Sequence, residues 1–170
     1  GRAHRTRLPP PPRFGPGGLR RLRLRDPRVS EIILVVHAAS TWWMVGLIWF
    51  VQIVHYPLFD GVGEPGWIRY ATRHRSRTTV VVMPPMLVEL ATSVWLVIER
   101  PDLVAWIGAG LVGLIWLSTF ALQVPLHGRL GRRFRGGDVG LLVWSNWIRT
   151  IAWSARGLLA ASLLLDTRIA

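Results

Sequence analysis

The sequence predicts an all-α membrane protein in which four transmembrane helices form a bundle behind an extended basic N-terminal arm. Hydrophobic residues make up 51% of the 170 residues and come in four blocks, each close to the roughly 20 residues that a membrane-spanning helix needs. Charged residues lie between these blocks, and the polar residues inside them recur at helical spacings. Because a helix satisfies its own backbone in lipid, each block is expected to be a helix.

Residues 1–30 are expected to form the arm, which is rich in arginine and contains the run "LPPPPRFGPGG". Proline and glycine oppose a long helix there, and the positive charge opposes a hydrophobic core. Two interpretations stay open. The arm is a tail that faces solvent or lipid headgroups, or residues 1–28 dock on other membrane protein subunits. Residues 31–170 then form the four-helix transmembrane domain.

The first two helices are expected at about residues 32–54 and 79–98. A stripe at spacings of three and four runs along the first of them: His37, Thr41, Met44, Ile48, Gln52 and His55. The second carries Glu89 on one face, and Pro84 and Pro85 are expected to kink it.

The last two helices are expected at about residues 103–124 and 140–165. The short connection "ERPD" forces the third helix to run antiparallel to the second, with Pro101 at its start. The polar face of the third helix holds Trp116, Phe120, Gln123 and His127, and that of the fourth holds Asn146, Arg149, Trp153 and Arg156. All four polar faces are expected to meet at the axis of the bundle.

The helix directions bring several polar residues to the membrane face with the two longer loops: Gln52, His55, His74, Gln123, His127, Asn146 and Arg149. Glu89 is expected nearer the middle of the membrane. A lone carboxylate is costly in lipid, so Glu89 is expected to pair with Arg149 or with Arg156.

The net charge of +12 alone is typical of a nucleic-acid-binding protein, but the long apolar blocks favour the lipid bilayer as the partner and no nucleic acid. The sequence has no cysteine, so it offers no disulfide and no cysteine-ligated metal. The P-loop, GxGxxG, GxSxG and HExxH patterns of soluble enzymes are also absent from the sequence.

The histidines favour a cofactor hypothesis. His55, His74 and His127 are candidate metal ligands, because three imidazoles suit zinc, copper or iron, and two on different helices suit haem b. His37 is an alternative axial ligand, while Glu89, Asn146 and Arg149 are candidates for binding a propionate, a quinone head or a proton. The opposing interpretation is structural, with His55 and His127 at helix ends and His74 in a basic loop, "RHRSR".

Two resemblances bear on these hypotheses. The stretch "HAASTWWMVGLIWFVQIVHYPLF" resembles, at a distance, the four-helix membrane haem proteins of the protoporphyrinogen oxidase and copper-resistance D types, which implies a haem ligand at His37, beside Trp43 and Gly46. The strings "WFVQIVHYPLF", "PPMLVEL", "IWLSTFALQVPLHGRL" and "NWIRTIAWSARG" resemble a family of uncharacterised bacterial four-helix membrane proteins over about residues 30–165. That second resemblance implies a multi-pass protein of the bacterial cytoplasmic (inner) membrane.

Two functions are expected from these features. The first is an accessory subunit of a larger respiratory or photosynthetic electron-transfer complex, anchored by the basic arm. The alternative is a redox protein that binds haem b or a metal through the His/Glu/Arg cluster. A transporter built around Glu89 and Arg149 ranks last, because four short helices without repeat symmetry lack the usual transporter architecture.

Overall fold

The computed structural model describes residues 27–169. Within that range every regular element is helical, which confirms the all-α class. Residues 1–26 of the predicted arm (1–30) lie outside the described residues, so the prediction that residues 1–28 dock on a partner subunit is untested. The first helix already begins at Pro27, slightly before the expected end of the arm.

The helical segments follow one another with short connections. In chain order they are α2 (Pro27–Phe50), η1 (Val51–His55), η2 (Pro57–Val62), α3 (Glu64–Glu99), α4 (Leu103–Ser118), η3 (Thr119–Gln123), α5 (Val124–Leu130) and α6 (Gly136–Ile169). The segments η1 and η3 are π-helical turns, and η2 is a 3₁₀ helix. Each π turn continues the helix before it.

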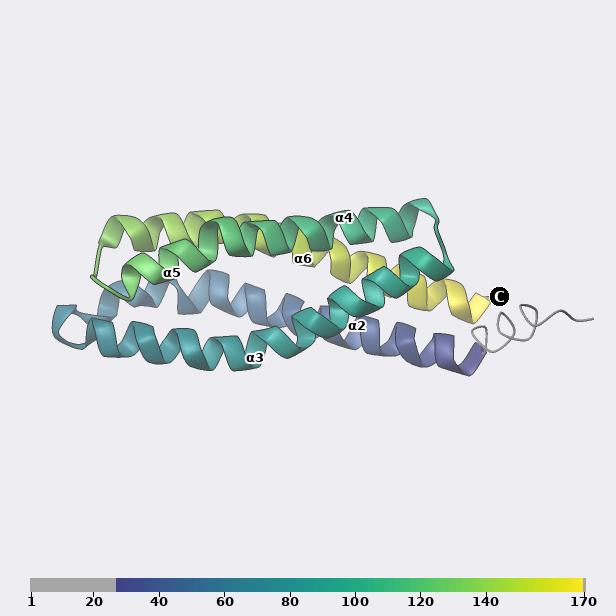
Figure 1. Cartoon of the computed structure of the whole chain (residues 1–170), viewed down its shortest axis with the longest axis horizontal. Helices are drawn as coiled ribbons and strands as arrows, with labels where there is room; N and C mark the ends of the chain where they lie inside the picture. The colour runs from purple at the N-terminus through teal and green to yellow at the C-terminus, as the bar shows by residue number, and fades with distance from the viewer. Residues whose placement is uncertain (1–26, 170) are drawn as a thin grey trace, which may run out of the picture.

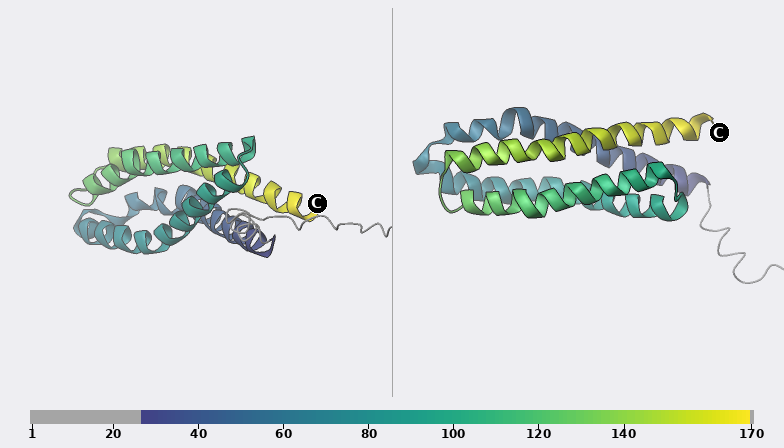
Figure 2. Two further views of the ribbon diagram at one scale, coloured as in Figure 1. Left: turned by 45° about the vertical axis from the view of Figure 1, so that its right-hand side comes forward. Right: turned by 90° about the horizontal axis from the view of Figure 1, so that it is seen from above.

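Four helices are long and apolar enough to cross a membrane: Pro27–His55, Glu64–Glu99, Leu103–Leu130 and Gly136–Asp166. They run side by side in an elongated bundle (Figures 1 and 2). Large apolar side chains such as Ile98, Leu103 and Trp144 are exposed on its outer surface. An exposed apolar belt suits lipid and is unfavourable in water, so the chain is a multi-pass membrane protein.

The packing order places the helices at the corners of a square. Helix α2 packs against α3 and α6, and α4 packs against the same two helices. The described residues of α3 and α6 do not pack against each other, so these two helices lie diagonally opposite. One end of the bundle holds η2, the start of α3 and the connection from α5 to α6 (left in Figure 1), and we call it the loop end. The turn between α3 and α4 lies at the other end.

The second transmembrane helix is longer than its apolar block predicts. Gly63, with φ of 73°, ends the preceding turn, and Pro65 lies in the first turn of α3. No proline or glycine follows between Trp67 and Met83, so the basic run "RHRSR" is helical. The expected loop around His74 is therefore wrong. The helix continues through Pro84 and Pro85, and α3 turns obliquely across the bundle near its middle (Figure 1).

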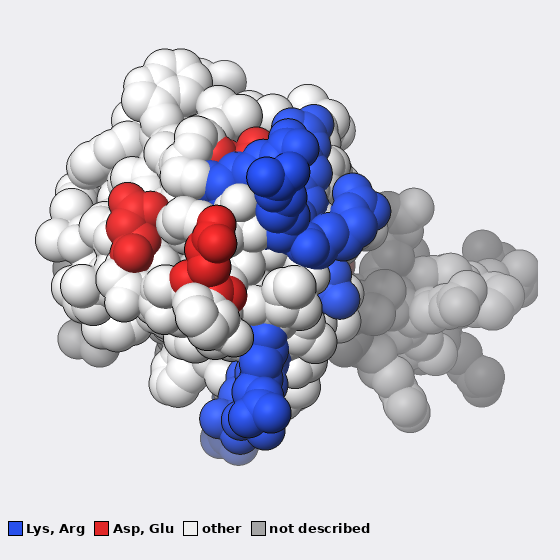
Figure 3. Space-filling view, turned by 90° about the vertical axis from the view of Figure 1, so that its left-hand side faces the viewer, with Lys and Arg blue, Asp and Glu red and all other residues white. Residues whose placement is uncertain are grey.

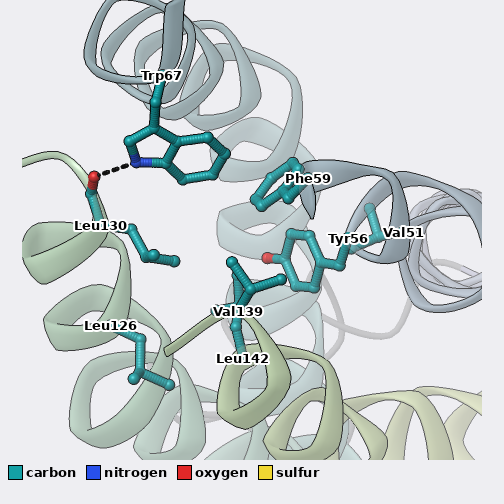
Figure 4. Packing of buried hydrophobic residues seen from close by; sticks show 8 residues of the cluster. All are labelled: Val51, Tyr56, Phe59, Trp67, Leu126, Leu130, Val139 and Leu142. Carbon is teal, nitrogen blue, oxygen red and sulfur yellow. Dashed lines mark hydrogen bonds between the residues drawn. The ribbon is translucent and has the colours of Figure 1, made fainter. Parts of the chain in front are cut away.

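A cluster of buried apolar and aromatic side chains closes the loop end (Figure 4): Val51, Tyr56, Phe59, Trp67, Leu126, Leu130, Val139 and Leu142. The indole of Trp67 donates a hydrogen bond of 2.6 Å to the Leu130 carbonyl oxygen. This contact ties the start of α3 to the end of α5. The cluster fixes the positions of the histidines beside it, because Phe59 packs edge-on against both His55 and His74.

Candidate functional site

The interior holds two buried arginines on α6, and their surroundings differ. Arg156 pairs with Glu89 across the diagonal of the bundle, with 2.5 Å between Arg156 Nε and Glu89 Oε1. Thr41 donates a second hydrogen bond of 2.8 Å to the same carboxylate oxygen. Of the two partners predicted for Glu89, Arg156 is therefore confirmed, and Glu89 forms no ion pair with Arg149.

The remaining donors of Arg156 also have partners. Nη1 donates to the carbonyl oxygen of Gly108, and Nη2 donates to Ser93 Oγ at 2.9 Å. A methyl group at Gly108 would lie 3.2 Å from Nη1, so the glycine gives the guanidinium room to approach α4. Arg156 thus binds α3 and α4 from α6 with its charge neutralised.

His37 belongs to this centre. Its Nε2 faces Arg156 Nη2 at 3.2 Å, and its Nδ1 lies 2.7 Å from Thr92 Oγ1. Both ring nitrogens are engaged, so His37 does not present a free nitrogen to a haem iron. The polar contacts of this centre join α2, α3, α4 and α6, which indicates that the centre stabilises the bundle.

A layer of amides lies nearer the loop end. Asn146 Nδ2 donates to Gln52 Oε1 at 2.9 Å, and Gln52 Nε2 donates to the Val143 carbonyl oxygen at 3.1 Å. Gln123 Nε2 donates to Ser145 Oγ at 3.0 Å. Both glutamines lie in the π turns, η1 and η3, where the extra residue per turn displaces side chains from ordinary helical phase.

Arg149 is the second buried arginine, with 6% of its surface exposed. Its Nη1 donates to Asn146 Oδ1 at 3.3 Å, and the Tyr56 hydroxyl lies within hydrogen-bonding reach of the guanidinium. Its Nε has no hydrogen-bond partner among the described residues. Among residues 27–169, no carboxylate forms an ion pair with Arg149. The described part of the chain therefore supplies no counter-ion for this buried cation.

A cavity of about 460 Å³ lies beside Arg149. Its walls are mainly apolar and come from all four transmembrane helices, with Met44, Ile48, Val82, Met86 and Trp116 among them. Thr79, Phe120 and Val124 also line it and are exposed, so the cavity reaches the surface between α3 and the η3–α5 segment.

Three buried polar atoms without partners belong to residues that line this cavity: Arg149 Nε, Gln123 Oε1 and His74 Nε2. Buried polar atoms are nearly always satisfied in folded proteins, because leaving one bare costs about 1–3 kcal/mol. The three atoms offer one donor, one acceptor and one imidazole nitrogen. The arrangement suits a polar head group whose apolar body fills the rest of the cavity.

The three histidines of the loop end lie together, as the helix directions predict. His55 Nε2 and His74 Nδ1 are 2.8 Å apart, and the ring centres of His74 and His127 are 5.3 Å apart. His127 Nε2 faces the Tyr56 hydroxyl at 3.0 Å. In the described part of the chain, no group of three or more histidine and carboxylate side chains is arranged to hold a metal ion.

The predicted site residues thus fall into two separate sites. Asn146, Arg149, His74 and His127 lie at or beside the cavity with His55 behind them, whereas Glu89 and His37 belong to the Arg156 centre.

The sequence prediction missed Tyr56, whose signal is its place in "VHYP" beside a candidate histidine. Burial raises the pKa of the Tyr56 hydroxyl, against a smaller opposing effect of Arg149, so it stays neutral and can donate.

No protein-family model, curated protein or solved structure matches this chain. The family likeness described from the sequence motifs accordingly stays a prediction.

Proposed function

We propose that this chain is a membrane-embedded binding protein for an amphiphile with an anionic head group and an apolar body. The observation that carries the proposal is the buried charge of Arg149, which lines the cavity and has no counter-ion among residues 27–169. The ligand head would supply the missing negative charge and accept the hydrogen bond of Arg149 Nε.

The two buried arginines provide an internal comparison. Arg156 has a carboxylate from the protein and a partner for each donor group, so its charge is compensated whether or not a ligand is present. Arg149 has only neutral partners, Asn146 and Tyr56. An isolated charge away from water is strongly disfavoured. An anionic ligand is the simplest source of compensation for Arg149.

The shape of the cavity supports the same class of ligand. Its volume lies within the range of roughly 300–1,000 Å³ that is usual for small-molecule sites. The unpartnered polar atoms come from His74, Gln123 and Arg149, and the apolar lining includes the methionines Met83 and Met86. Flexible methionine side chains adapt to apolar bodies of different outline. The exposed rim between α3 and α5 gives a ligand access from the lipid.

The redox alternative predicted from the sequence fits less well. Haem b with two axial histidines needs two free imidazole nitrogens that face each other across a gap of macrocycle size. His37 uses both of its nitrogens, and His55 and His74 face each other at hydrogen-bond distance. The described histidines therefore do not fit bis-histidine haem ligation. A quinone-type ligand that ionises at a ring hydroxyl stays within the proposed class.

The test compares two probes that differ in head-group charge. Dodecanoate and dodecanol would be titrated into the purified full-length chain in detergent, and bound probe would be counted by native mass spectrometry. We expect dodecanoate to bind at least tenfold more tightly, because a charge-assisted hydrogen bond contributes about 1.5–3 kcal/mol and 1.4 kcal/mol is tenfold in affinity. Equal affinity for both probes in the wild type would contradict the proposal.

A second readout locates the ligand. Trp116 lines the cavity, whereas Trp144 is exposed on the outer surface of α6. A brominated dodecanoate quenches the fluorescence of a tryptophan that it contacts. We expect Trp116→Phe to remove most of the saturable quenching and Trp144→Phe, the matched control, to retain it. Loss of the signal in Trp144→Phe with retention in Trp116→Phe would place the ligand elsewhere.

The accessory-subunit function stays a prediction, because most of the arm on which it depends lies outside the described residues. It is compatible with ligand binding, since a subunit of a larger complex can hold a lipid-like molecule. Purification from native membranes tests it directly. We expect larger membrane subunits at fixed stoichiometry, and recovery of this chain alone would count against that function.

A further inference from the structure

A second concave site lies beside the cavity at the loop end. It is an open cleft of about 520 Å³, lined by His55, Gly66, Arg69, Tyr70, Arg73, His74, Arg77 and Thr78. His74 and Thr78 also line the cavity of Arg149, but every other residue of the cleft is distinct from those of the cavity. Nothing in the function proposed above uses the cleft.

The charge of the cleft comes from three arginines spaced four residues apart on α3. Arg69, Arg73 and Arg77 lie on one face of the helix, spread over about 12 Å at a rise of 1.5 Å per residue. All three side chains are exposed, and none of them forms an ion pair with a carboxylate of the described residues. Mutual repulsion at this spacing is unfavourable unless an anion lies between them.

An aromatic wall lies beside the arginines. His74, which is 9% exposed, lines the cleft as well as the cavity. Its Nδ1 is engaged by His55 at 2.8 Å. Tyr70 stacks nearly parallel to the His74 ring and forms part of the same wall. The cleft therefore combines three guanidinium groups that lack ion-pair partners among the described residues with an aromatic wall.

The position of the cleft along α3, relative to the apolar surface of that helix, indicates which kind of anion it would bind. The apolar, exposed part of α3 begins at Val80 and Val81, less than one helical turn after Arg77. The three arginines thus lie where the hydrocarbon core gives way to the headgroup layer, which is the level of lipid phosphates. Arginine binds phosphate oxygens through two parallel hydrogen bonds.

From these observations we infer that the cleft binds the phosphate group of an anionic phospholipid, held by Arg69, Arg73 and Arg77. The acyl chains of that lipid lie along the exposed apolar surface of α3 that starts at Val80. The site is independent of the proposed anionic amphiphile in the neighbouring cavity, because the phosphate is held by residues outside the cavity.

The chain provides a matched control in a second basic cluster at the same end of the bundle, formed by Arg129, Arg132, Arg133 and Arg135. Figure 3 shows that arginine side chains gather in separate regions of this end. In that second cluster, Arg129 lies 3.9 Å from Asp138. A triple variant of the cleft, R69Q/R73Q/R77Q, and a triple variant of the loop, R132Q/R133Q/R135Q, remove the same charge from the two places.

The experiment titrates phosphatidylglycerol and phosphatidylcholine into the purified full-length protein and its variants, and counts bound lipid by native mass spectrometry. We expect the first wild-type site to prefer phosphatidylglycerol at least tenfold. We expect R69Q/R73Q/R77Q to abolish that preference, the single variant R73Q to weaken it severalfold, and R132Q/R133Q/R135Q to change it less than threefold. Arg149→Met should leave it unchanged, which separates this site from the cavity.

Three results would overturn the inference. The two triple variants could weaken phosphatidylglycerol binding equally, which would show attraction by overall charge. The cleft variants, folded by the criterion of an unchanged unfolding midpoint, could bind like the wild type. Inorganic phosphate at low millimolar concentration could displace the lipid, which would show a site for free phosphate.

Discussion

Neutralising Glu89 should destabilise the bundle strongly, because the carboxylate is the counter-ion of a buried arginine. Glu89 is 1% exposed and accepts hydrogen bonds from Arg156 and Thr41. In Glu89→Gln, the amide oxygen can still accept a hydrogen bond, but the charge of Arg156 is left with neutral partners. Breaking a buried ion pair in this way typically costs about 3–5 kcal/mol.

The two substitutions at Glu89 should differ in size. Glu89→Gln keeps one acceptor, so we expect a loss near the lower limit, about 3 kcal/mol, which corresponds to roughly 150-fold in the unfolding constant. Glu89→Leu removes every acceptor that the side chain offers to Arg156, so we expect about 5 kcal/mol. The double variant Glu89→Leu/Arg156→Met should recover most of this loss, because apolar replacements of a buried pair are often neutral or stabilising.

The assay is reversible unfolding in mixed micelles with increasing denaturing detergent, followed by tryptophan fluorescence. The free energies of the wild type, the two single variants and the double variant form a cycle that gives the coupling between the two side chains. A Glu89→Gln protein within about 0.5 kcal/mol of the wild type, below the usual cost of a broken buried pair, would refute the account of Arg156 as a charge-compensated residue that stabilises the bundle.

Three further predictions use the same unfolding assay. Arg149→Met should not destabilise the ligand-free protein by more than about 1 kcal/mol, since it removes a buried charge that has no counter-ion among the described residues, and a loss as large as that of Glu89→Gln would contradict this. Gly108→Ala should cost about 1–3 kcal/mol, because the new methyl group would lie 3.2 Å from Arg156 Nη1. An unchanged unfolding midpoint would show that α4 moves to make room for the methyl group without loss of stability. Trp67→Phe should cost about 1–3 kcal/mol, because the Leu130 carbonyl oxygen loses its hydrogen-bond donor at the loop end. An unchanged free energy of unfolding would show that water replaces the indole as the donor.

Helical phase carried much of the information that could be predicted from the sequence. The stripe of the first helix is buried at Thr41, Met44 and Ile48, because polar and small residues at spacings of three and four identify the interior face of a transmembrane helix. Antiparallel helix directions also sufficed to bring His55, His74 and His127 together.

Helical spacing gave a wrong prediction where the helix is not a regular α-helix. Phe120 was expected on the polar face of the third helix, yet it is 60% exposed. It lies in η3, where hydrogen bonds between residues i and i+5 break the 3.6-residue period on which the prediction depends. The π turn η1 similarly determines the placement of Gln52. No residue type in either stretch identifies a π turn, so the sequence did not reveal them.

The sequence also did not determine which arginine pairs with Glu89. Arg149 and Arg156 lie on the same face of α6, about 10 Å apart along the axis at 1.5 Å per residue, and residue counting did not separate them. The structure decides through packing, since the missing side chain of Gly108 admits the Arg156 guanidinium beside α4. The division into one compensated and one uncompensated arginine therefore emerged only in three dimensions.

The most direct test of that division is the dissociation constant of dodecanoate for the wild type and for Arg149→Met, measured by native mass spectrometry with dodecanol as the neutral reference. We predict that Arg149→Met binds dodecanoate at least tenfold more weakly than the wild type and binds dodecanol within twofold of it, as expected for a lost charge-assisted hydrogen bond of about 1.5–3 kcal/mol. Unchanged affinity for dodecanoate in a folded Arg149→Met protein would contradict the claim that this arginine binds the head group of an anionic ligand.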